Sequence, residues 1–276
     1  MKRVFLWMLI AAGLAAAAPA PAEAQSRRRL TDPATGESYN VEVSLGFWKP
    51  TPDFVISSEG FGIPGTPIDL VEDLGIEKRQ FREFRAVLRP ARKHKFRIQF
   101  IPIKYEVENA ILTRQIVFNG IRYDVGLPVN ATADWKAWRF GYEYDFISRD
   151  RGYLGLVVEA KYTDVRLELQ SPAADEFSRA QAPIPSLGLI GRGYLAKNVS
   201  ITGEFTGFRL LNREDDDYQG NYYDFDIYGT INFSNNVGAS VGYRSLDVGY
   251  LIVDPPARDF GDLTLKGVYF MGTVRF

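Results

Sequence analysis

Hydrophobic and polar residues alternate with a period of two along most of the chain. The clearest segment places five large aromatic residues on one parity and mostly charged residues on the other: Trp138, Phe140, Tyr142, Tyr144 and Phe146 against Arg139, Gly141, Glu143 and Asp145. Successive side chains of a β-strand point to opposite faces of a sheet. The segment therefore predicts a strand with one aromatic face and one charged face.

Ten segments show this alternation, and each predicts a strand. They lie near residues 39 to 49, 79 to 89, 94 to 107, 131 to 147, 152 to 169, 184 to 196, 198 to 210, 221 to 234, 236 to 251 and 263 to 276. Past residue 25 there is no run of about 18 apolar residues, so transmembrane helices are not expected.

The connectors between these segments alternate in length. Short ones occupy 89 to 93, 148 to 151, 197 and 234 to 236, and long ones occupy 50 to 78, 108 to 130, 170 to 183, 211 to 220 and 252 to 262. Short turns on one side and long loops on the other are typical of membrane barrels with periplasmic turns and extracellular loops. The sequence thus predicts an all-β fold, a transmembrane antiparallel up-and-down β-barrel. Ten strands are expected, with twelve or eight as alternatives, and an even number places both termini in the periplasm.

Two long connectors carry local signals. Asn119-Gly120 between apolar residues predicts a hairpin. Its arms of about eight residues are shorter than the 9 to 11 of a spanning strand, so we expect a hairpin within the loop; two further membrane strands would raise the number to twelve. The segment 69 to 75, with apolar residues at helical spacing and Gly75 at its end, predicts a short helix over the barrel mouth or at the membrane interface. An irregular loop is the alternative.

The N-terminus has the order of a secretory signal peptide. Lys2 and Arg3 precede an apolar run over residues 4 to 18, and Ala22-Glu23-Ala24 forms a cleavage site of small residues. The run is shorter than the roughly 20 residues that a spanning helix needs. We therefore expect a signal peptide at 1 to 24, a periplasmic stub at 25 to 38 and a single barrel domain at 39 to 276.

Composition narrows the class of protein further. The net charge is −1, and there is no cysteine. A basic face for nucleic acid is absent, and neither disulfides nor thiolate chemistry is available. Aromatic residues make up 14% although mean hydropathy is −0.17, which favours a barrel with a polar interior.

The last strand, residues 266 to 276, ends in Phe276 with apolar Val274 and Phe270 at alternating positions before it. It resembles the C-terminal assembly signal of outer-membrane β-barrel proteins. At the level of architecture the chain is similar to the small Gram-negative OmpA/OmpX-like barrels of the porin superfamily. The resemblance implies location in the cell outer membrane, contact with its lipid and lipopolysaccharide, recognition by the barrel-assembly machinery, and a monomer. The resemblance assigns a catalytic role to no residue of this chain.

Candidate chemistry is sparse. His94 stands among basic residues in a predicted periplasmic turn, with no converging ligands for a metal. Histidine-dependent outer-membrane hydrolases generally use a histidine near the outer rim, so His94 lies at the wrong end. Inward carboxylate pairs, such as Asp224 with Asp226, are more often partners of arginines than catalysts. We expect no enzyme activity, no cofactor and no metal.

The polar parity predicts a charged lumen. Its inward residues include Glu42, Arg85, Arg97, Arg139, Glu143, Asp145, Glu159, Arg192, Glu204, Asp224, Asp226 and Arg244, with Glu83, Lys95 and Lys161 on the same parities. Ten strands lie near the limit at which side chains fill a barrel. We expect Arg139, Arg192 and Arg244 to bridge carboxylates across a filled lumen. A structural or surface-interaction role follows, with a narrow pore for ions or small solutes as the alternative.

Deletion of Phe276 is expected to lower the amount of protein in the outer membrane, because it removes the terminal aromatic residue of the assembly signal that the chain resembles. Immunoblotting of outer-membrane fractions measures the effect. An undiminished amount would contradict the assembly role of this residue.

Overall fold

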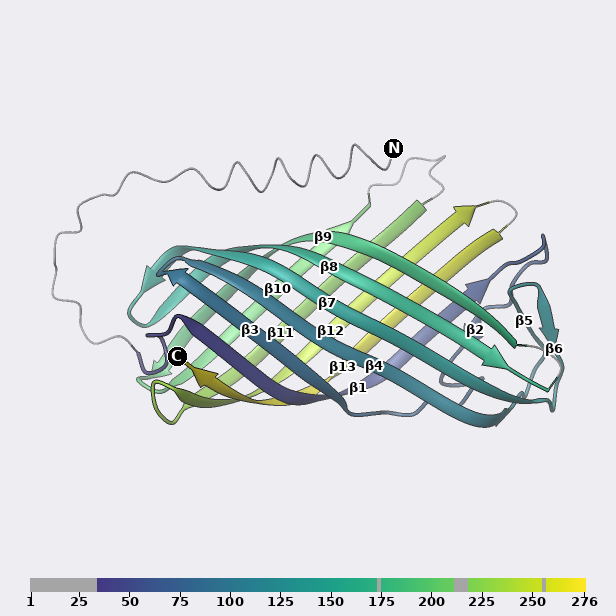
Figure 1. Ribbon diagram of the computed structural model, residues 1–276, viewed down its shortest axis with the longest axis horizontal. Helices are drawn as coiled ribbons and strands as arrows, with labels where there is room; N and C mark the ends of the chain where they lie inside the picture. Colours follow the sequence, from purple (N-terminus) through teal and green to yellow (C-terminus); the bar gives the residue numbers. More distant parts are fainter. Residues whose placement is uncertain (1–33, 173–174, 211–217, 255–256) are drawn as a thin grey trace. The chain divides into compact units, whose positions relative to one another are not determined.

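The computed structural model describes residues 34 to 172, 175 to 210, 218 to 254 and 257 to 276 (Figure 1). The expected signal peptide lies outside these residues. Within them, none of the elements is a helix with the length and apolar character to cross a membrane.

Ten antiparallel strands close into a barrel, as predicted. They are β1 (Val41–Ser58), β3 (Phe81–Ala91), β4 (His94–Ile111), β7 (Pro128–Arg149), β8 (Gly152–Gln170), β9 (Asp175–Ala196), β10 (Val199–Arg209), β11 (Tyr218–Asn232), β12 (Val237–Asp254) and β13 (Ala257–Arg275). Each strand pairs with the next along the chain, and β13 returns to β1. That seam runs from Glu42 opposite Arg275 to Ser58 opposite Asp259.

The two ends of the barrel differ. At one end, here the turn end, short turns join β3 to β4, β7 to β8, β9 to β10 and β11 to β12, and the C-terminus lies there (Figure 1). The opposite end, the loop end, holds the connection from β1 to β3 and the connection from β4 to β7. The prediction of short and long connectors on opposite sides is confirmed for these elements.

The Asn119-Gly120 hairpin forms within the second long connector. Strands β5 (Ile116–Phe118) and β6 (Ile121–Tyr123) pair only with each other. Asn119 and Gly120 have φ of 50° and 78°, the left-handed conformation that a tight hairpin turn requires. The hairpin therefore adds no membrane strand.

The expected helix at 69 to 75 is wrong. Strand β2 (Ile68–Asp69) pairs with β1, and a single turn follows in which the Gly75 amide donates to the Val71 carbonyl at 3.0 Å. Gly75 has φ of 73° and ends the turn. One turn is too short to gain from helix propagation. The segment is held instead by Leu70, Leu74 and Ile76, which are buried inside the barrel.

The polarity of the two strand faces reverses partway along the barrel. On β7 the outward residues from Trp138 to Phe146 are aromatic and the inward ones polar, whereas nearer the loop end the outward residues are polar and the inward ones apolar. The outward set there is Asn130, Thr132, Asp134 and Lys136, and the inward set is Val129, Ala131, Ala133, Trp135 and Ala137. Strands β1, β4, β8, β12 and β13 reverse in the same way.

The outward apolar residues form a belt around the half of the barrel at the turn end. On β7 it runs over residues 138 to 146, about 27 Å along the strand and roughly 19 to 22 Å along the barrel axis after the usual tilt. The apolar band of a membrane barrel is about 25 Å tall. The belt therefore comes close to the height of a bilayer's hydrocarbon region, and the loop-end half extends beyond it.

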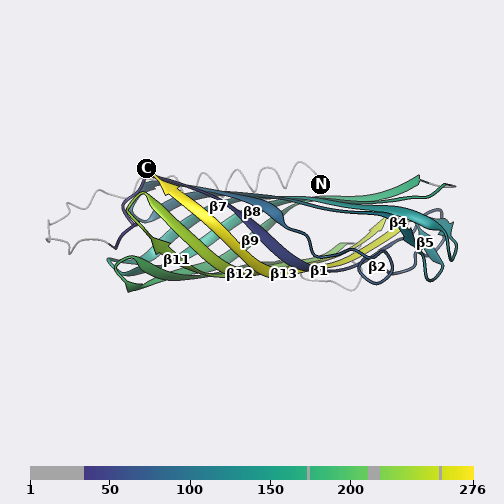
Figure 2. The same cartoon turned by 90° about the horizontal axis from the view of Figure 1, so that it is seen from below.

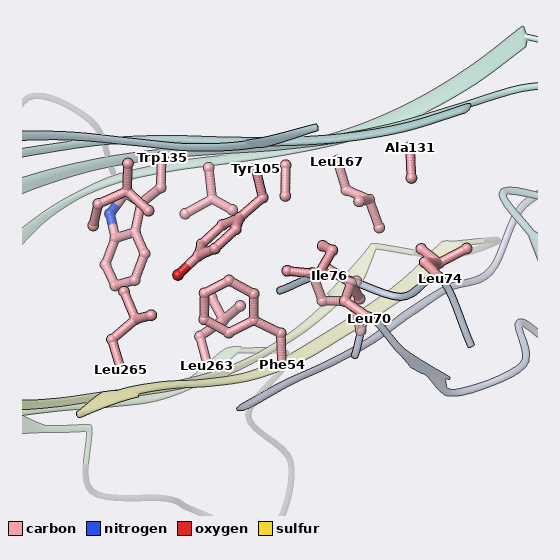
Figure 3. Packing of buried hydrophobic residues seen from close by; sticks show 14 of the residues in the cluster. Phe54, Leu70, Leu74, Ile76, Tyr105, Ala131, Trp135, Leu167, Leu263 and Leu265 are labelled. Carbon is pink, nitrogen blue, oxygen red and sulfur yellow. The ribbon is translucent and has the colours of Figure 1, made fainter. Parts of the chain in front are cut away.

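The loop-end half is a sandwich rather than a round barrel. Pairing of β9 with β10 ends at Leu187 opposite Gly207, and pairing of β3 with β4 begins only at Phe84 opposite Phe100. Beyond these points β4, β7, β8 and β9 form one layer and β11, β12, β13 and β1 form the other (Figure 2). Phe54 and Leu263 from one layer face Tyr105 and Leu167 from the other (Figure 3).

All five predicted long connectors are shorter than expected. Strand β9 begins at residue 175, β12 runs to 254 and β13 begins at 257, inside the connectors expected at 170 to 183 and 252 to 262. β1 also extends nine residues past the predicted limit of 49, to Ser58. The apolar-outward pattern that marked each strand ends at the edge of the belt, although the strand itself continues.

An arginine in the belt is expected to destabilise the barrel, whereas one above it is not. Phe140→Arg places a charge near the middle of the belt and is expected to cost about 2 to 4 kcal/mol in bilayers, while Thr132→Arg on the same face of β7 costs about 0 to 1 kcal/mol. Urea unfolding in lipid vesicles measures both. Equal costs would contradict the placement of the belt.

Candidate functional site: the charged lumen and its apolar seal

Arg139 is the centre of the charged lumen. It projects inward from the middle of β7 and its side chain is only 6% exposed. Nη2 donates to Glu159 at 2.8 Å and to Glu204 at 2.7 Å, and Nη1 donates to Asp224 at 3.0 Å. These carboxylates come from β8, β10 and β11, so one guanidinium joins four walls of the barrel.

A second group of charges lies beside Arg139 and shares Asp224 with it. Arg244 on β12 donates to Asp224 at 2.5 Å and lies 3.5 Å from Glu83. Arg85, next to Glu83 on β3, reaches across to Asp226 at 3.0 Å. Charges on non-neighbouring strands are thus paired through the lumen.

A third group lies around Glu143 on β7. Lys95 approaches Glu143 at 2.6 Å and Asp145 at 3.0 Å, and Arg97 joins Glu143 at 3.5 Å to Glu204 at 2.5 Å. An unpaired buried charge is costly. Because the three groups share Glu204 and Asp224 as partners, many charges can occupy the barrel interior as pairs.

The turn end is covered by the segment just before β1. Glu37 accepts from Arg192 at 2.9 Å and from the Tyr194 hydroxyl at 2.8 Å, while its carbonyl accepts from Arg89 at 2.6 Å. The Thr35 amide donates to the Lys197 carbonyl at 2.8 Å. The last residues of the predicted stub thus lie across the turn end and bond to the walls.

Positive and negative charges balance in this network. Nine cationic side chains, Arg85, Arg89, Lys95, Arg97, Arg139, Lys161, Arg192, Arg244 and Arg275, form ion pairs with nine anionic ones, Glu37, Glu42, Glu83, Glu143, Asp145, Glu159, Glu204, Asp224 and Asp226. A cavity of about 60 Å³ lies between them, lined by Arg85, Arg97 and Arg139 among others. It has room for a few water molecules, far less than a solute path requires.

An apolar seal lies above the network at the loop end. We give this name to the buried cluster around Trp48, Phe54, Tyr105, Trp135 and Leu265, together with Leu70, Leu74 and Ile76 (Figure 3). The turn that carries Leu70 and Leu74 lies between the two layers of the sandwich. A cavity between Phe54 and Leu263 measures only about 10 Å³. The seal leaves no room for water between the network and the loop end at this point.

All the lumen residues named from the sequence point inward, and Glu42 pairs with Arg275 at the turn end. Sequence reasoning missed Glu37, Arg89, Arg275 and the apolar seal. Arg275 and Arg89 share the inward parity of their strands, so the period of two could have found both. Glu37 precedes the first strand and carries no such signal.

The assembly residues face outward. Phe270, Val274 and Phe276 are exposed on the belt. The Phe276 carbonyl also accepts from the Asn40 amide at 2.8 Å and from the Val41 amide at 3.1 Å. Deletion of Phe276 therefore removes part of the seam as well as the aromatic ring, and Phe276→Ala is the cleaner variant for the assembly test.

His94 lies at the turn end as the first residue of β4, where Nδ1 is 2.6 Å from the Tyr142 hydroxyl. The described part of the chain brings together no group of three or more His, Asp and Glu side chains arranged to hold a metal.

Comparison with known proteins identifies similar folds only. No family model and no curated protein matches the chain. Among solved structures, the outer membrane protease OmpT from Escherichia coli is 8% identical, with a TM-score of 0.46 over 83% of this chain and 96% of that one. The toluene transporter TbuX of Ralstonia pickettii is 10% identical, with a TM-score of 0.40 over 89% and 92%. The toluene transporter TodX of P. putida is 9% identical, with a TM-score of 0.35 over 90% and 93%.

Removal of Arg139 is expected to destabilise the barrel strongly. Arg139→Ala leaves Glu159, Glu204 and Asp224 short of a partner, which costs about 3 to 5 kcal/mol for a buried ion pair. Lys136→Ala, an exposed cation on the same strand, is the matched control and is expected to change little. Unfolding in vesicles measures both, and a stability loss no greater than that of the control would contradict a tightly paired network.

Glu37 gives the turn-end segment a pH dependence. Burial raises the pKa of Glu37, but the charge and hydrogen bond of Arg192 outweigh it and hold that pKa below the ordinary value of 4.5. A lowered pKa adds stability above the unfolded value and loses it as the pH falls through the folded one. Glu37→Gln should therefore lower the melting temperature at neutral pH and converge with wild type in acid. A difference that persists in acid would contradict the ionised contact.

Proposed function

We propose that the protein is an outer-membrane β-barrel with a closed lumen and a structural or surface-interaction role. The observation that carries this proposal is the packing of the interior, with paired charges in the belt half and an apolar seal in the loop-end half. A solute path has to pass both. An eight-stranded barrel is filled by its own side chains. The ten-stranded barrel of this protein is flattened into a sandwich at one end, and its side chains likewise fill the interior.

The belt supports placement in a bilayer, with the turn end in the periplasm and the loop end outside the cell. Both ends of the described chain, residues 34 and 276, lie at the turn end, as expected for an even number of strands. We propose that lipid and lipopolysaccharide surround the belt, that the barrel-assembly machinery inserts the chain, and that it acts as a monomer. A relationship with the small OmpA/OmpX-like barrels belongs to the same proposal.

The loop-end half provides the surface for interaction. Its two layers stand beyond the belt and carry polar residues outward, and the β5–β6 hairpin is anchored by buried Ile116 and Phe118. Asn119 of the hairpin donates to Glu176 on β9 at 2.9 Å. The loops are thus held on a rigid base, which suits recognition better than transport. We propose no catalytic role.

A narrow pore for ions or small solutes is the second candidate. The cavity of about 60 Å³ among the lumen charges favours it, because this is where water can enter the network. Conduction would require both Glu37 and the Leu70 turn to move out of the lumen.

Conductance of the refolded barrel in a planar bilayer tests the proposal. Wild type is expected to give no steady current. A variant with Leu70, Leu74 and Ile76 changed to Ser and Glu37 changed to Ala loosens both the seal and the turn-end cover. It is the positive control for insertion, since it is expected to leak. Stable wild-type conductance at the nanosiemens scale would contradict the closed lumen and support the pore.

A further inference from the structure

Four exposed cations stand at one level of the outer wall, directly beyond the belt. Going from the belt toward the loop end, the first outward residue after the last apolar one is a cation on four strands. It is Lys266 on β13, Lys49 on β1, Arg82 on β3 and Lys136 on β7. These strands and β4 are five neighbours in the sheet, and the corresponding residue of β4 is Pro102, opposite Lys136. We call Lys49, Arg82, Lys136 and Lys266 the basic collar.

The collar covers only one side of the barrel. At the same level the other five strands carry Asp164, Pro185, Gly207, Asn221 and Ser245. A general requirement for cations at the edge of the belt would place them on every wall. The asymmetry therefore indicates a local surface.

Lys49, Arg82 and Lys266 have no counterion in the described part of the chain, whereas Lys136 lies opposite Asp164 on β8. None of the four forms an ion pair or a side-chain hydrogen bond in the described part of the chain, whereas exposed cations farther from the belt do: Arg166 lies 2.9 Å from Glu168 and Arg179 lies 2.7 Å from Asp164. Lys49 lies opposite Val268, two residues from Lys266, and Arg82 lies opposite Phe47, two residues from Lys49. Like charges at such diagonal positions repel each other.

We propose that the basic collar binds the phosphate groups of a phosphorylated glycolipid in the outer leaflet, the lipid A part of lipopolysaccharide. This rests on the membrane placement in the proposed function. The phosphates of such a lipid lie just above its acyl chains. A lipid whose chains pack against Leu45, Phe47 and Phe270 of the belt brings its phosphates level with Lys49, Lys266 and Arg82. Both residue types bind phosphate: arginine donates two parallel hydrogen bonds to its oxygens, and lysine acts as a point charge.

Binding of lipid A to the barrel in nanodiscs tests the site. Nanodiscs of phosphatidylcholine are prepared with and without diphosphoryl lipid A, and bound lipid A is measured by native mass spectrometry and by the shift in melting temperature. The variant Lys49→Gln, Arg82→Gln and Lys266→Gln is expected to bind about 100-fold more weakly, since each basic group at an anionic surface contributes about a factor of five.

The matched control is Arg122→Gln, Arg166→Gln and Arg179→Gln, which changes the net charge equally but removes exposed cations that already pair with Asp124, Glu168 and Asp164. It is expected to bind lipid A as wild type does. Equal loss in both variants, no loss in either, or the same thermal shift from inorganic phosphate alone would overturn the proposal. Failure of wild type to enter nanodiscs would instead contradict the membrane placement.

Discussion

Closure of the sheet between β1 and β13 determines the surroundings of every side chain in the barrel. Because β1 pairs with β13 over its whole length, every strand has two neighbours in the belt half, and a bilayer demands that backbone groups be satisfied in this way. Closure also divides the side chains into an inward and an outward set. The inward set of ten strands has little space, so its charges must pair with each other, and the network around Arg139 and Asp224 is the result.

The reversal of polarity along the strands follows from the surroundings of each half. In the belt half the outward side faces an apolar medium and the inward side holds paired charges. In the loop-end half the outward side is polar and the two walls meet, so apolar side chains such as Phe54 and Tyr105 pack between them. The same strand thus belongs to a membrane barrel at one end and to a water-exposed sandwich at the other. The charged network fills the interior of the belt half, and the apolar seal fills the interior of the loop-end half.

The fold could be predicted from the sequence because a period of two is strong wherever one face is uniformly apolar. The aromatic face of β7 fixed its parity, and with it the inward positions of Arg139, Glu143 and Asp145. The extensions of β1, β9 and β13 could not be found in the same way, since beyond the belt the polarity inverts and the pattern resembles a loop. Leu70 and Leu74 suggested a helix because their spacing is helical, whereas burial between two layers decides their conformation. Glu37 depends on a tertiary contact with Arg192 that no local pattern encodes.

The position where the belt ends decides the rest, because the proposed closed lumen, the exposure of the loop-end half and the basic collar all depend on it. The chain has no cysteine, so single-cysteine variants can report exposure to water without background. In intact cells treated with a membrane-impermeant maleimide, Thr51→Cys, Thr132→Cys and Thr264→Cys should be labelled, and Leu45→Cys, Phe140→Cys and Phe270→Cys should stay unlabelled until detergent is added. Labelling of the second set in cells, or protection of the first set by the membrane, would contradict this position of the belt.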